Sequence, residues 1–281
     1  MPGRVEGKVA FITGAARGMG RSHAVRLAEE GADIIAVDLC GPVDSVSPEY
    51  YRAATAEDLA ETVRQVEKLD RRIVARQADV RDAAALGRAL DEGVAEFGRL
   101  DAVVANAGVV TFATDTPGLD ERTWQDHLDV NLTGVWHTIK VGVPHLLATG
   151  RGGSVTVVSS LAGLKGVGNL GAYTASKHGV AGLVKVLVGE LGPQGIRVNT
   201  VHPNCIDTDM LRGEKIFRLF RPDLEQPTFE DLEPAIATMN AYRMGAIEPV
   251  HVSNAVLYLV SDEAAYVSGT QLTIDAGASV V

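Results

Sequence analysis

A glycine-rich turn near the amino terminus constrains the fold of this chain more than any other feature. The apolar run from Val9 to Ile12 leads through Thr13-Gly14-Ala15-Ala16-Arg17-Gly18-Met19-Gly20 into a helical pattern that starts at Arg21. A helix that follows a strand in this way presents free N–H groups and a positive dipole end to an anion. Gly14 can adopt a positive φ, Gly18 leaves room for phosphates, and Gly20 lets helix and strand pack closely. The turn therefore predicts a dinucleotide-binding α/β fold.

The end of the next apolar run indicates which dinucleotide binds. Residues 33–37 lead into Asp38, about twenty residues beyond the glycines, where a carboxylate can accept hydrogen bonds from both hydroxyls of an adenosine ribose. A 2′-phosphate at this place would be repelled and would lose hydrogen bonds. Arg17 permits the opposite interpretation, because its guanidinium can reach a 2′-phosphate, but it can equally be a solvated loop cation. We give Asp38 the greater weight and predict NAD.

Short apolar runs alternate with helical patterns along the whole chain. The runs are rich in Val, Ile and Ala and are continuously apolar, as expected for a parallel sheet that helices cover on both faces. N-cap signals at Thr55 and Asp82 and glycines at positions 31, 98 and 150 mark helix ends. We expect strands at 9–13, 33–38, 73–78, 102–105, 154–159, 197–201 and 271–274, and helices near 18–30, 56–69, 82–97, 120–148, 171–192 and 248–261. This pattern predicts a single α/β domain over 1–281, a Rossmann-type doubly wound parallel sheet of about seven strands.

Two segments interrupt this alternation. Residues 39–55 place Pro42, Pro48 and the pair Tyr50-Tyr51 where a short loop would suffice, so we expect an ordered insertion beside the adenosine end of the cofactor. Residues 210–248 contain several prolines between apolar clusters, which is typical of a substrate lid. Its apolar residues form either the roof of a substrate pocket or contacts with the core or another subunit: Ile216, Phe217, Leu219, Phe220, Phe229, Ile236 and Met239.

Composition excludes several classes of partner. The chain has 281 residues, a net charge of −10 and no uninterrupted apolar run long enough to span a bilayer, so we expect neither nucleic acid nor membrane as a partner. Two cysteines, Cys40 and Cys205, allow one disulfide, but the absence of a signal-like amino terminus favours free thiols in the cytoplasm. We expect a small-molecule partner and no metal ion.

A tyrosine and a lysine four residues apart predict acid–base chemistry. Tyr173 and Lys177 lie on one face of a predicted helix, so the ammonium can sit near the phenol. At about 5 Å and an effective dielectric constant of about 20, the attraction between phenolate and ammonium is roughly 3 kcal/mol, which would lower the tyrosine pKa by roughly two. Ser160 ends the preceding strand and can donate a hydrogen bond to a substrate oxygen. No G-x-S-x-G motif accompanies it, so we do not expect a nucleophilic serine.

Together, these motifs resemble the short-chain dehydrogenase/reductase family from Gly7 to about Gly277. The resemblance implies a catalytic tetrad of Asn131, Ser160, Tyr173 and Lys177, in which Asn131 holds a water of the proton relay and Lys177 also binds the nicotinamide ribose. It places Asp79 and Val80 beside the adenine, Thr208 at the nicotinamide end, and the main chain of Ile206 at the carboxamide. The implied cofactor residues are Gly14, Arg17, Gly18, Met19, Gly20, Asp38, Leu39, Asp79, Val80, Asn106, Ala107, Gly108, Tyr173, Lys177, Pro203, Ile206 and Thr208.

The chain also departs from the family pattern. Ala105 stands where many members have Asn. Asn204 stands where the family usually has Gly, and Asn tolerates a left-handed backbone better than other residues with a side chain. His202 is interpreted as a packed loop histidine. The insertion at 39–55 resembles the mycofactocin-associated, carveol dehydrogenase-like subset, which implies a tightly held NAD that another redox carrier reoxidises in place. The family resemblance also implies a homotetramer with a contact at residues 278–281.

We therefore expect an enzyme that transfers a hydride between NAD and a secondary alcohol or ketone. Leu161, Leu164 and Val167 follow the catalytic strand and favour an apolar alicyclic or terpenoid-like alcohol. Two alternatives remain open: an NADPH-dependent carbonyl or 3-oxoacyl reductase, which Asp38 disfavours, and a non-catalytic NAD-binding sensor, which the intact Ser160, Tyr173 and Lys177 disfavour.

Overall fold

Seven strands form one parallel sheet in the computed structural model, which describes residues 3–112 and 115–281. Their order across the sheet is β3-β2-β1-β4-β5-β6-β7, and every neighbouring pair runs parallel. The strands are β1 (Val9–Thr13), β2 (Asp33–Asp38), β3 (Ile73–Gln77), β4 (Ala102–Ala105), β5 (Gly153–Val158), β6 (Ile196–Pro203) and β7 (Gln271–Ile274). This confirms the predicted doubly wound sheet. Strand β6 continues two residues beyond its predicted end, to Pro203, because it pairs with β7 there.

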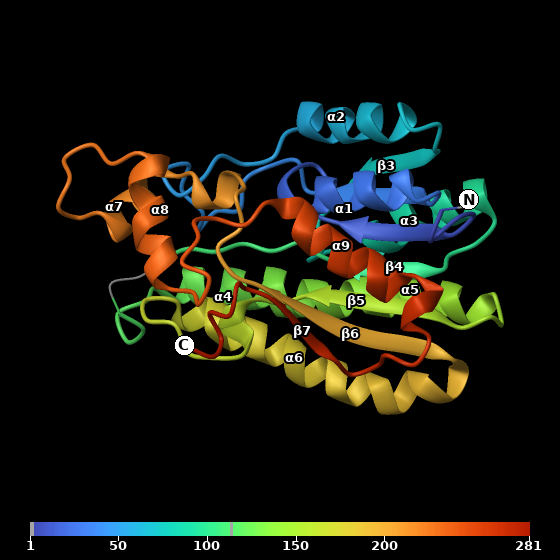
Figure 1. The fold of residues 1–281 in the computed structure, drawn as a ribbon. Coiled ribbons are helices and arrows are strands. Elements are labelled where there is room, and N and C mark those ends of the chain that lie inside the picture. Colours follow the sequence, from blue (N-terminus) through green and yellow to red (C-terminus); the bar gives the residue numbers. More distant parts are fainter. Residues whose placement is uncertain (1–2, 113–114) are drawn as a thin grey trace.

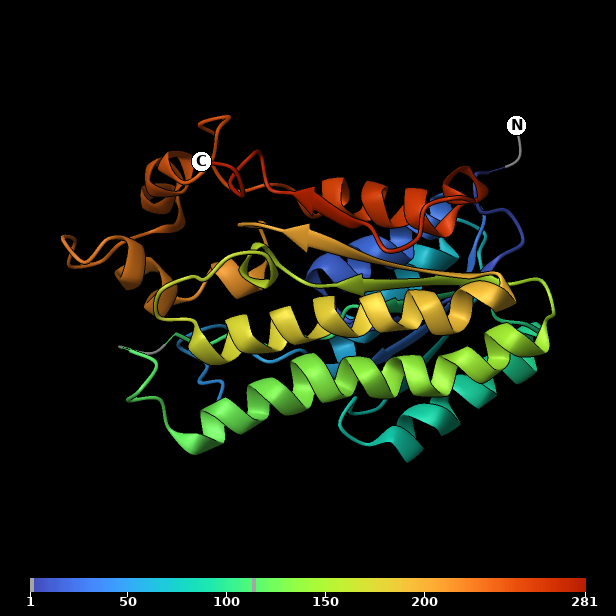
Figure 2. The ribbon, with the colours of Figure 1, turned by 90° about the horizontal axis from the view of Figure 1, so that it is seen from below.

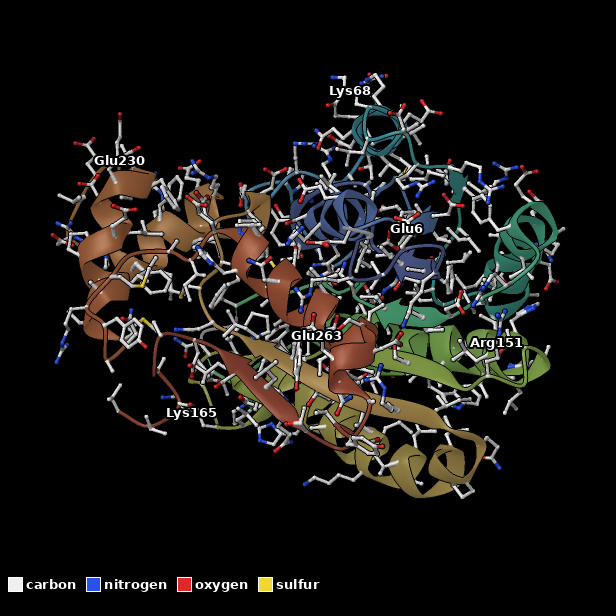
Figure 3. The ribbon with its side chains drawn as sticks, turned by 45° about the vertical axis from the view of Figure 1, so that its right-hand side comes forward. Glu6, Lys68, Arg151, Lys165, Glu230 and Glu263 are labelled. Carbon is white, nitrogen blue, oxygen red and sulfur yellow. The ribbon has the colours of Figure 1, made fainter. Side chains whose placement is uncertain are left out.

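Helices cover both faces of the sheet (Figures 1 and 2). They are α1 (Gly18–Glu29), α2 (Ala56–Glu67), α3 (Ala83–Phe97), α4 (Glu121–Leu128), α5 (Gly134–Ala148), α6 (Gly171–Leu191), α7 (Glu214–Phe220), α8 (Phe229–Thr238) and α9 (Pro249–Val260). In β1, Ala10 and Ile12 pack in a cluster with residues of α1 and α9, whereas Val9 and Phe11 pack with residues of α3, α5 and α6. Both faces of the strand are therefore buried, which explains its continuously apolar sequence. Charged side chains such as Lys68 and Glu230 point away from these layers (Figure 3).

The predicted signals for helix ends are confirmed. Thr55 and Asp58 form a capping box at the start of α2, and the Asp82 carboxylate accepts from the N–H groups of Ala84 and Ala85 at the start of α3. Gly98 closes α3 with a φ of 76°. Residues 120–148, predicted as one helix, are instead α4 and α5 joined by a π-helical turn at Asp129–Thr133. Such turns cannot be read from apolar periodicity, and they frequently occur at functional sites.

The segments 39–55 and 210–248 meet beyond the carboxyl ends of the strands. The Lys215 N–H donates to the Glu49 carbonyl at 3.0 Å, and a Cβ on Gly213 would lie 1.4 Å from the Tyr50 carbonyl oxygen. Only a glycine lets the two segments approach so closely. Helices α7 and α8 pack through Ile216, Leu232 and Ile236. Leu219 and Met239 are each 38% exposed in the single chain, and their place in a pocket roof or in a contact with another subunit stays a prediction.

The cysteines and the length of the helices test two further expectations. Cys40 and Cys205 are free thiols, as predicted. Within the described part of the chain, no helix combines the length and apolar character needed to cross a bilayer.

Candidate active site

A cleft lies at the carboxyl ends of β1, β2 and β4, where ligands bind in open α/β sheets. Many of the predicted cofactor residues line it: Gly14, Arg17, Gly18, Met19, Gly20, Asp38, Leu39, Asp79, Val80, Asn106, Ala107, Gly108 and Thr208. The insertion contributes a further wall, which includes Val43, Val46 and Tyr51. Tyr173, Lys177, Pro203 and Ile206 are not part of this lining.

The glycine turn has the geometry that its sequence predicts. Gly14 has a φ of 68°, a conformation that side chains disfavour. A Cβ on Gly20 would lie 1.9 Å from the Gly14 carbonyl oxygen and 2.7 Å from the Asn106 amide nitrogen. That amide in turn donates to the carbonyls of Thr13 and Gly14, at 2.9 and 3.2 Å. The first turn of α1 can therefore approach the end of β1 only because residue 20 is a glycine.

Asp38 lies in the cleft lining and is fixed there by two main-chain N–H groups. One carboxylate oxygen accepts from the Ala16 N–H at 3.0 Å and the other accepts from the Cys40 N–H at 2.9 Å. Each oxygen keeps a lone pair for a ribose hydroxyl. A nucleotide with an unphosphorylated adenosine ribose fits this arrangement, whereas a 2′-phosphate would be repelled.

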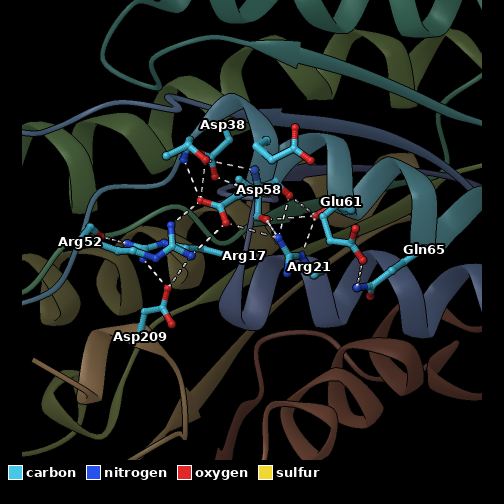
Figure 4. Close-up of polar contacts among 12 residues, drawn as sticks. Arg17, Arg21, Asp38, Arg52, Asp58, Glu61, Gln65 and Asp209 are labelled. Atoms are coloured by element: carbon cyan, nitrogen blue, oxygen red, sulfur yellow. Dashed lines mark hydrogen bonds and ion pairs between the residues drawn. The ribbon is translucent and has the colours of Figure 1, made fainter.

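Arg17 lines the cleft, but its guanidinium is bound by other residues of the protein. Its guanidinium forms an ion pair with Asp209 at 2.6 Å and donates to the Arg52 carbonyl (Figure 4). Arg52 also reaches Asp209, at 3.1 Å. We call Arg17, Arg52 and Asp209 the clasp. It connects the glycine turn, the insertion and the segment before α7, so Arg17 is neither a solvated cation nor free to bind a 2′-phosphate.

The clasp is anchored to α2. Arg52 binds the Asp58 carboxylate through two nitrogens, at 2.5 and 2.9 Å. This pairing, together with the capping bonds from Thr55, holds the pKa of Asp58 well below its usual range. Asp58 is thus charged at neutral pH and holds Arg52, whose neighbours Tyr51 and Ala53 line the cleft.

Tyr173, Ser160 and Lys177 lie next to the cleft, since a Cβ on Gly108 of its lining would lie 3.4 Å from the Lys177 ammonium nitrogen. The Ser160 side chain lies close enough to Tyr173 to lower the pKa of its phenol. The Lys177 ammonium lies 5.6 Å from the centroid of the Tyr173 ring and donates to the Val158 carbonyl at 3.0 Å. Burial of Lys177 lowers its pKa to about 8. The structure therefore brings together an acid–base phenol, a hydroxyl donor and a cation.

The expected direction of the Tyr173 pKa is wrong for the protein alone. Loss of water around the phenol raises its pKa, and the nearby Ser160 side chain offsets this only in part. The attraction to Lys177 was expected to dominate, but burial disfavours the charged phenolate and the charged ammonium alike. Tyr173 is consequently protonated at neutral pH in the protein alone.

Asn131 lies in the π-helical turn and is fully buried. Its amide oxygen accepts from the Val109 N–H at 2.8 Å, and its nitrogen donates to the Val109 carbonyl at 2.9 Å and the Ser176 hydroxyl at 3.2 Å. The side chain therefore holds the segment that follows β4 against α6. Its predicted water in a proton relay stays a prediction.

The residues around the end of β6 have clear structural places. His202 is buried; its Nδ1 donates to the Ser160 carbonyl at 2.8 Å and its Nε2 lies 2.8 Å from the Thr200 hydroxyl, which confirms a packed histidine. Pro203 is the last residue of β6. Ile206 pairs with Ile247 in a parallel β-bridge. The Ile247 N–H donates to the Cys205 carbonyl and the Asp207 N–H donates to the Ile247 carbonyl, so the N–H and carbonyl of Ile206 itself point away from Ile247. The backbone of Asn204, where a left-handed conformation would have been tolerated, has no positive φ.

Sequence reasoning missed the contributions of Tyr51, Arg52, His127 and Asp209 to this region. The insertion was expected beside the adenosine, but Tyr51 packs with Val110 and Leu170 in a cluster that Tyr173 also contacts. The adjacent tyrosines at 50 and 51 were a visible signal of a buried contact. The remaining residues are charged or polar in ways that are common on surfaces, so no pattern singled them out.

Known proteins resemble the chain along almost its whole length. Residues 14–279 match the model of a family described as enoyl-(acyl carrier protein) reductase. The (−)-trans-carveol dehydrogenase of Rhodococcus erythropolis is 49% identical over 99% of both chains. The crystal structure of carveol dehydrogenase from Mycobacterium avium in complex with NAD is 53% identical, with a TM-score of 0.97 over 99% of this chain and 100% of the other. A short-chain dehydrogenase from Mycobacterium paratuberculosis bound to NAD is 42% identical, with a TM-score of 0.89 over 99% and 100% of the two chains.

Proposed function

The chain belongs to the short-chain dehydrogenase/reductase family, and on this premise we propose that it interconverts an apolar alicyclic secondary alcohol and its ketone with NAD. The observation that carries the proposal is the grouping of Tyr173, Ser160 and buried Lys177 beside a cleft whose lining includes Asp38. A sensor has no need of such a cluster. The relatives that are named as dehydrogenases agree with the proposed alcohol oxidoreductase activity.

The protein's own residues hold the alcohol and move its proton. Bound NAD would supply the hydride acceptor, and the glycine turn, Asp38 and Lys177 would hold it. Ser160 donates a hydrogen bond to the substrate oxygen, and Tyr173 removes the hydroxyl proton. Lys177 stabilises, through its positive charge, the phenolate form of Tyr173 that accepts this proton. In the direction of ketone reduction, Tyr173 returns the proton.

Apolar side chains around Tyr173 favour an alicyclic substrate. Leu161 is 5% exposed, and Leu170 packs with Val110, Val167 and Phe112 beside the phenol. Such a wall contributes binding energy in proportion to the apolar area that it covers. This agrees with the relatives that are named carveol dehydrogenases. Incubation of the purified protein with carveol and NAD tests the proposal: we expect carvone and reduced nicotinamide in equal amounts, and no product would contradict it.

Asp38→Asn is expected to weaken NAD binding by about tenfold and to reduce the preference over NADP, because charge-assisted hydrogen bonds to the ribose are lost and the repulsion of a 2′-phosphate disappears. Dissociation constants of both cofactors, measured by calorimetry, check this result. Asp70→Asn changes an exposed carboxylate after α2 and serves as the control. Equal loss of both cofactors in Asp38→Asn would show that the carboxylate does not select between them. A native protein that prefers NADP would favour an NADPH-dependent carbonyl or 3-oxoacyl reductase.

We also propose that NAD stays bound under the insertion and is reoxidised there by an external carrier of the mycofactocin type. The clasp supports retention, since Arg17 and Arg52 converge on Asp209 and link three segments that border the cleft. Purification without added cofactor tests it. A single stoichiometric reduction by carveol, followed by turnover only with an artificial electron acceptor, is the expected result. Continuous turnover that depends on free NAD would contradict it.

Asp209→Asn is expected to speed the release of NAD by about tenfold, because it removes the charge that both arginines bind. Exchange of bound NAD for an isotopically labelled NAD measures the rate. Asp223→Asn is the matched control: Asp223 pairs with Arg221 near α7, away from the cleft lining. An unchanged exchange rate in Asp209→Asn would argue against the clasp as a barrier.

The assembly and location are proposals of the same kind. We propose a homotetramer in the cytoplasm. Exposed apolar side chains on the outer helices and at the carboxyl terminus support subunit contacts: Trp136, Leu147, Val186, Val280 and Val281. Free thiols support a reducing compartment. Light scattering of the purified protein gives its oligomeric state.

A further inference from the structure

Each of the four residues that follow Asn106-Ala107-Gly108 is hydrogen-bonded by a side chain from elsewhere in the fold. The main chain of Val109 is bound on both sides by Asn131. The Val110 N–H donates to the Tyr51 hydroxyl at 3.0 Å, and the Thr111 N–H donates to His127 Nε2 at 3.1 Å. The Tyr50 hydroxyl donates to the Phe112 carbonyl at 2.6 Å. We call residues 109–112 the pinned segment.

The side chains that hold the pinned segment come from different parts of the chain. Asn131 and His127 belong to the helical stretch from α4 to the π-helical turn, whereas Tyr50 and Tyr51 belong to the insertion. His127 Nδ1 donates to the Thr123 carbonyl at 2.7 Å, which leaves Nε2 as the acceptor. The pinned segment thus lacks strand or helix hydrogen bonds of its own and takes its conformation from these side chains.

The insertion is itself firmly anchored, so its tyrosines can act as supports. At one end, Asp44 pairs with Arg122 at 2.5 Å, and the Ser45 N–H donates to Asp126 at 3.1 Å. At the other end, Glu49 binds Lys215 of α7 at 2.9 Å. The insertion therefore spans from α4 to α7 over the cleft, and the tyrosine pair lies between these anchors.

The pinned segment packs in the same apolar cluster as Tyr173. Val110 and Leu170 are buried with Tyr51, and Phe112, Val167 and Tyr173 pack against them. His127 meets the Tyr173 ring edge-on, with 6.4 Å between ring centroids. A shift of the pinned segment would change the apolar wall beside the phenol, where the ring of an alicyclic substrate would rest.

We infer that Tyr51 is a positioning residue for the alcohol: its hydroxyl holds Val110 so that the pinned segment forms the substrate wall, and the insertion serves the substrate as well as the cofactor. This inference rests on the proposed alcohol oxidoreductase activity. The Tyr51 ring also borders the cofactor cleft, but the hydroxyl points to Val110. The two roles can therefore be separated by removing the hydroxyl and keeping the ring.

Tyr51→Phe is expected to raise KM for carveol by about tenfold and to change kcat and NAD affinity by less than about twofold, because only the buried bond to Val110 is lost. The KM for 2-propanol, which is too small to reach the wall, should stay within about twofold of the native value. Hydrogen exchange of a peptide that covers Val110 should accelerate. Tyr266→Phe removes the hydroxyl of a fully exposed tyrosine and should leave all these quantities unchanged.

The outcomes separate this inference from the activity on which it rests. A native enzyme that oxidises carveol, together with a Tyr51→Phe variant of the same KM, would overturn the positioning role alone. Weaker NAD binding in that variant, with an unchanged ratio of carveol to 2-propanol efficiency, would also overturn it, because the insertion would then serve only the cofactor. A native protein that oxidises neither alcohol would instead overturn the proposed function.

Discussion

Replacing Tyr173 with Phe is expected to reduce alcohol turnover by at least about 1,000-fold while the protein stays folded and binds NAD. The phenol is the group that Ser160 contacts and that the Lys177 ammonium approaches. Phe keeps the ring and its packing against Val110 and Leu170 but cannot accept a proton. Steady-state rates with carveol, together with calorimetric NAD binding, measure the two effects separately.

A control shows whether the loss belongs to the site. Tyr242→Phe changes a tyrosine that is 76% exposed and should keep native rates. Turnover that persists in Tyr173→Phe would mean that another group moves the proton, and the assignment of the acid–base residue would then be wrong.

Replacing Gly20 with Ala is expected to have the largest effect on cofactor binding among single methyl additions. The new Cβ would lie 1.9 Å from the Gly14 carbonyl oxygen, which is backbone and cannot rotate away. The start of α1 must therefore move from the glycine turn, and the N–H groups that we propose bind the phosphates move with it. We expect a loss of NAD affinity of at least about 100-fold and a destabilisation of about 1–3 kcal/mol. Calorimetric titration and thermal unfolding measure these changes.

Gly182→Ala is the matched control. This glycine lies within α6, and a Cβ there would meet no atom within 4 Å. Because alanine favours a helix more than glycine does, the control is expected to gain about 0.5–1 kcal/mol of stability and to bind NAD normally. Gly20→Ala with native NAD affinity would contradict the proposed phosphate site.

Local patterns were sufficient to predict the sheet and its helices. The strands are continuously apolar because both faces are buried, and Thr55, Asp82 and Gly98 mark helix ends through bonds within a few residues. The candidate site followed for the same reason: the glycine turn, Asp38 and the pair Tyr173 and Lys177 are short motifs whose geometry depends on one strand or one helix.

The contacts that sequence reasoning missed join distant parts of the chain. Arg17 and Asp209 are 192 positions apart, and Tyr51 and Val110 are 59 apart. Sequence periodicity does not predict such a pair, because each of these residue types is also common on solvent-exposed surfaces. The direction of the Tyr173 pKa was missed for a related reason. The attraction to Lys177 follows from their spacing, but the loss of water around the phenol depends on packing by several segments.

Transfer of a deuterium from carveol to the bound nicotinamide tests the central claim most directly. Carveol deuterated at its carbinol carbon is incubated with the protein and NAD, and mass spectrometry follows the label in the reduced cofactor. The account predicts one deuterium in the reduced nicotinamide for each carvone formed by the native protein, and none with Tyr173→Phe. Direct hydride transfer at this site would be contradicted if carvone formed while the reduced cofactor carried no deuterium.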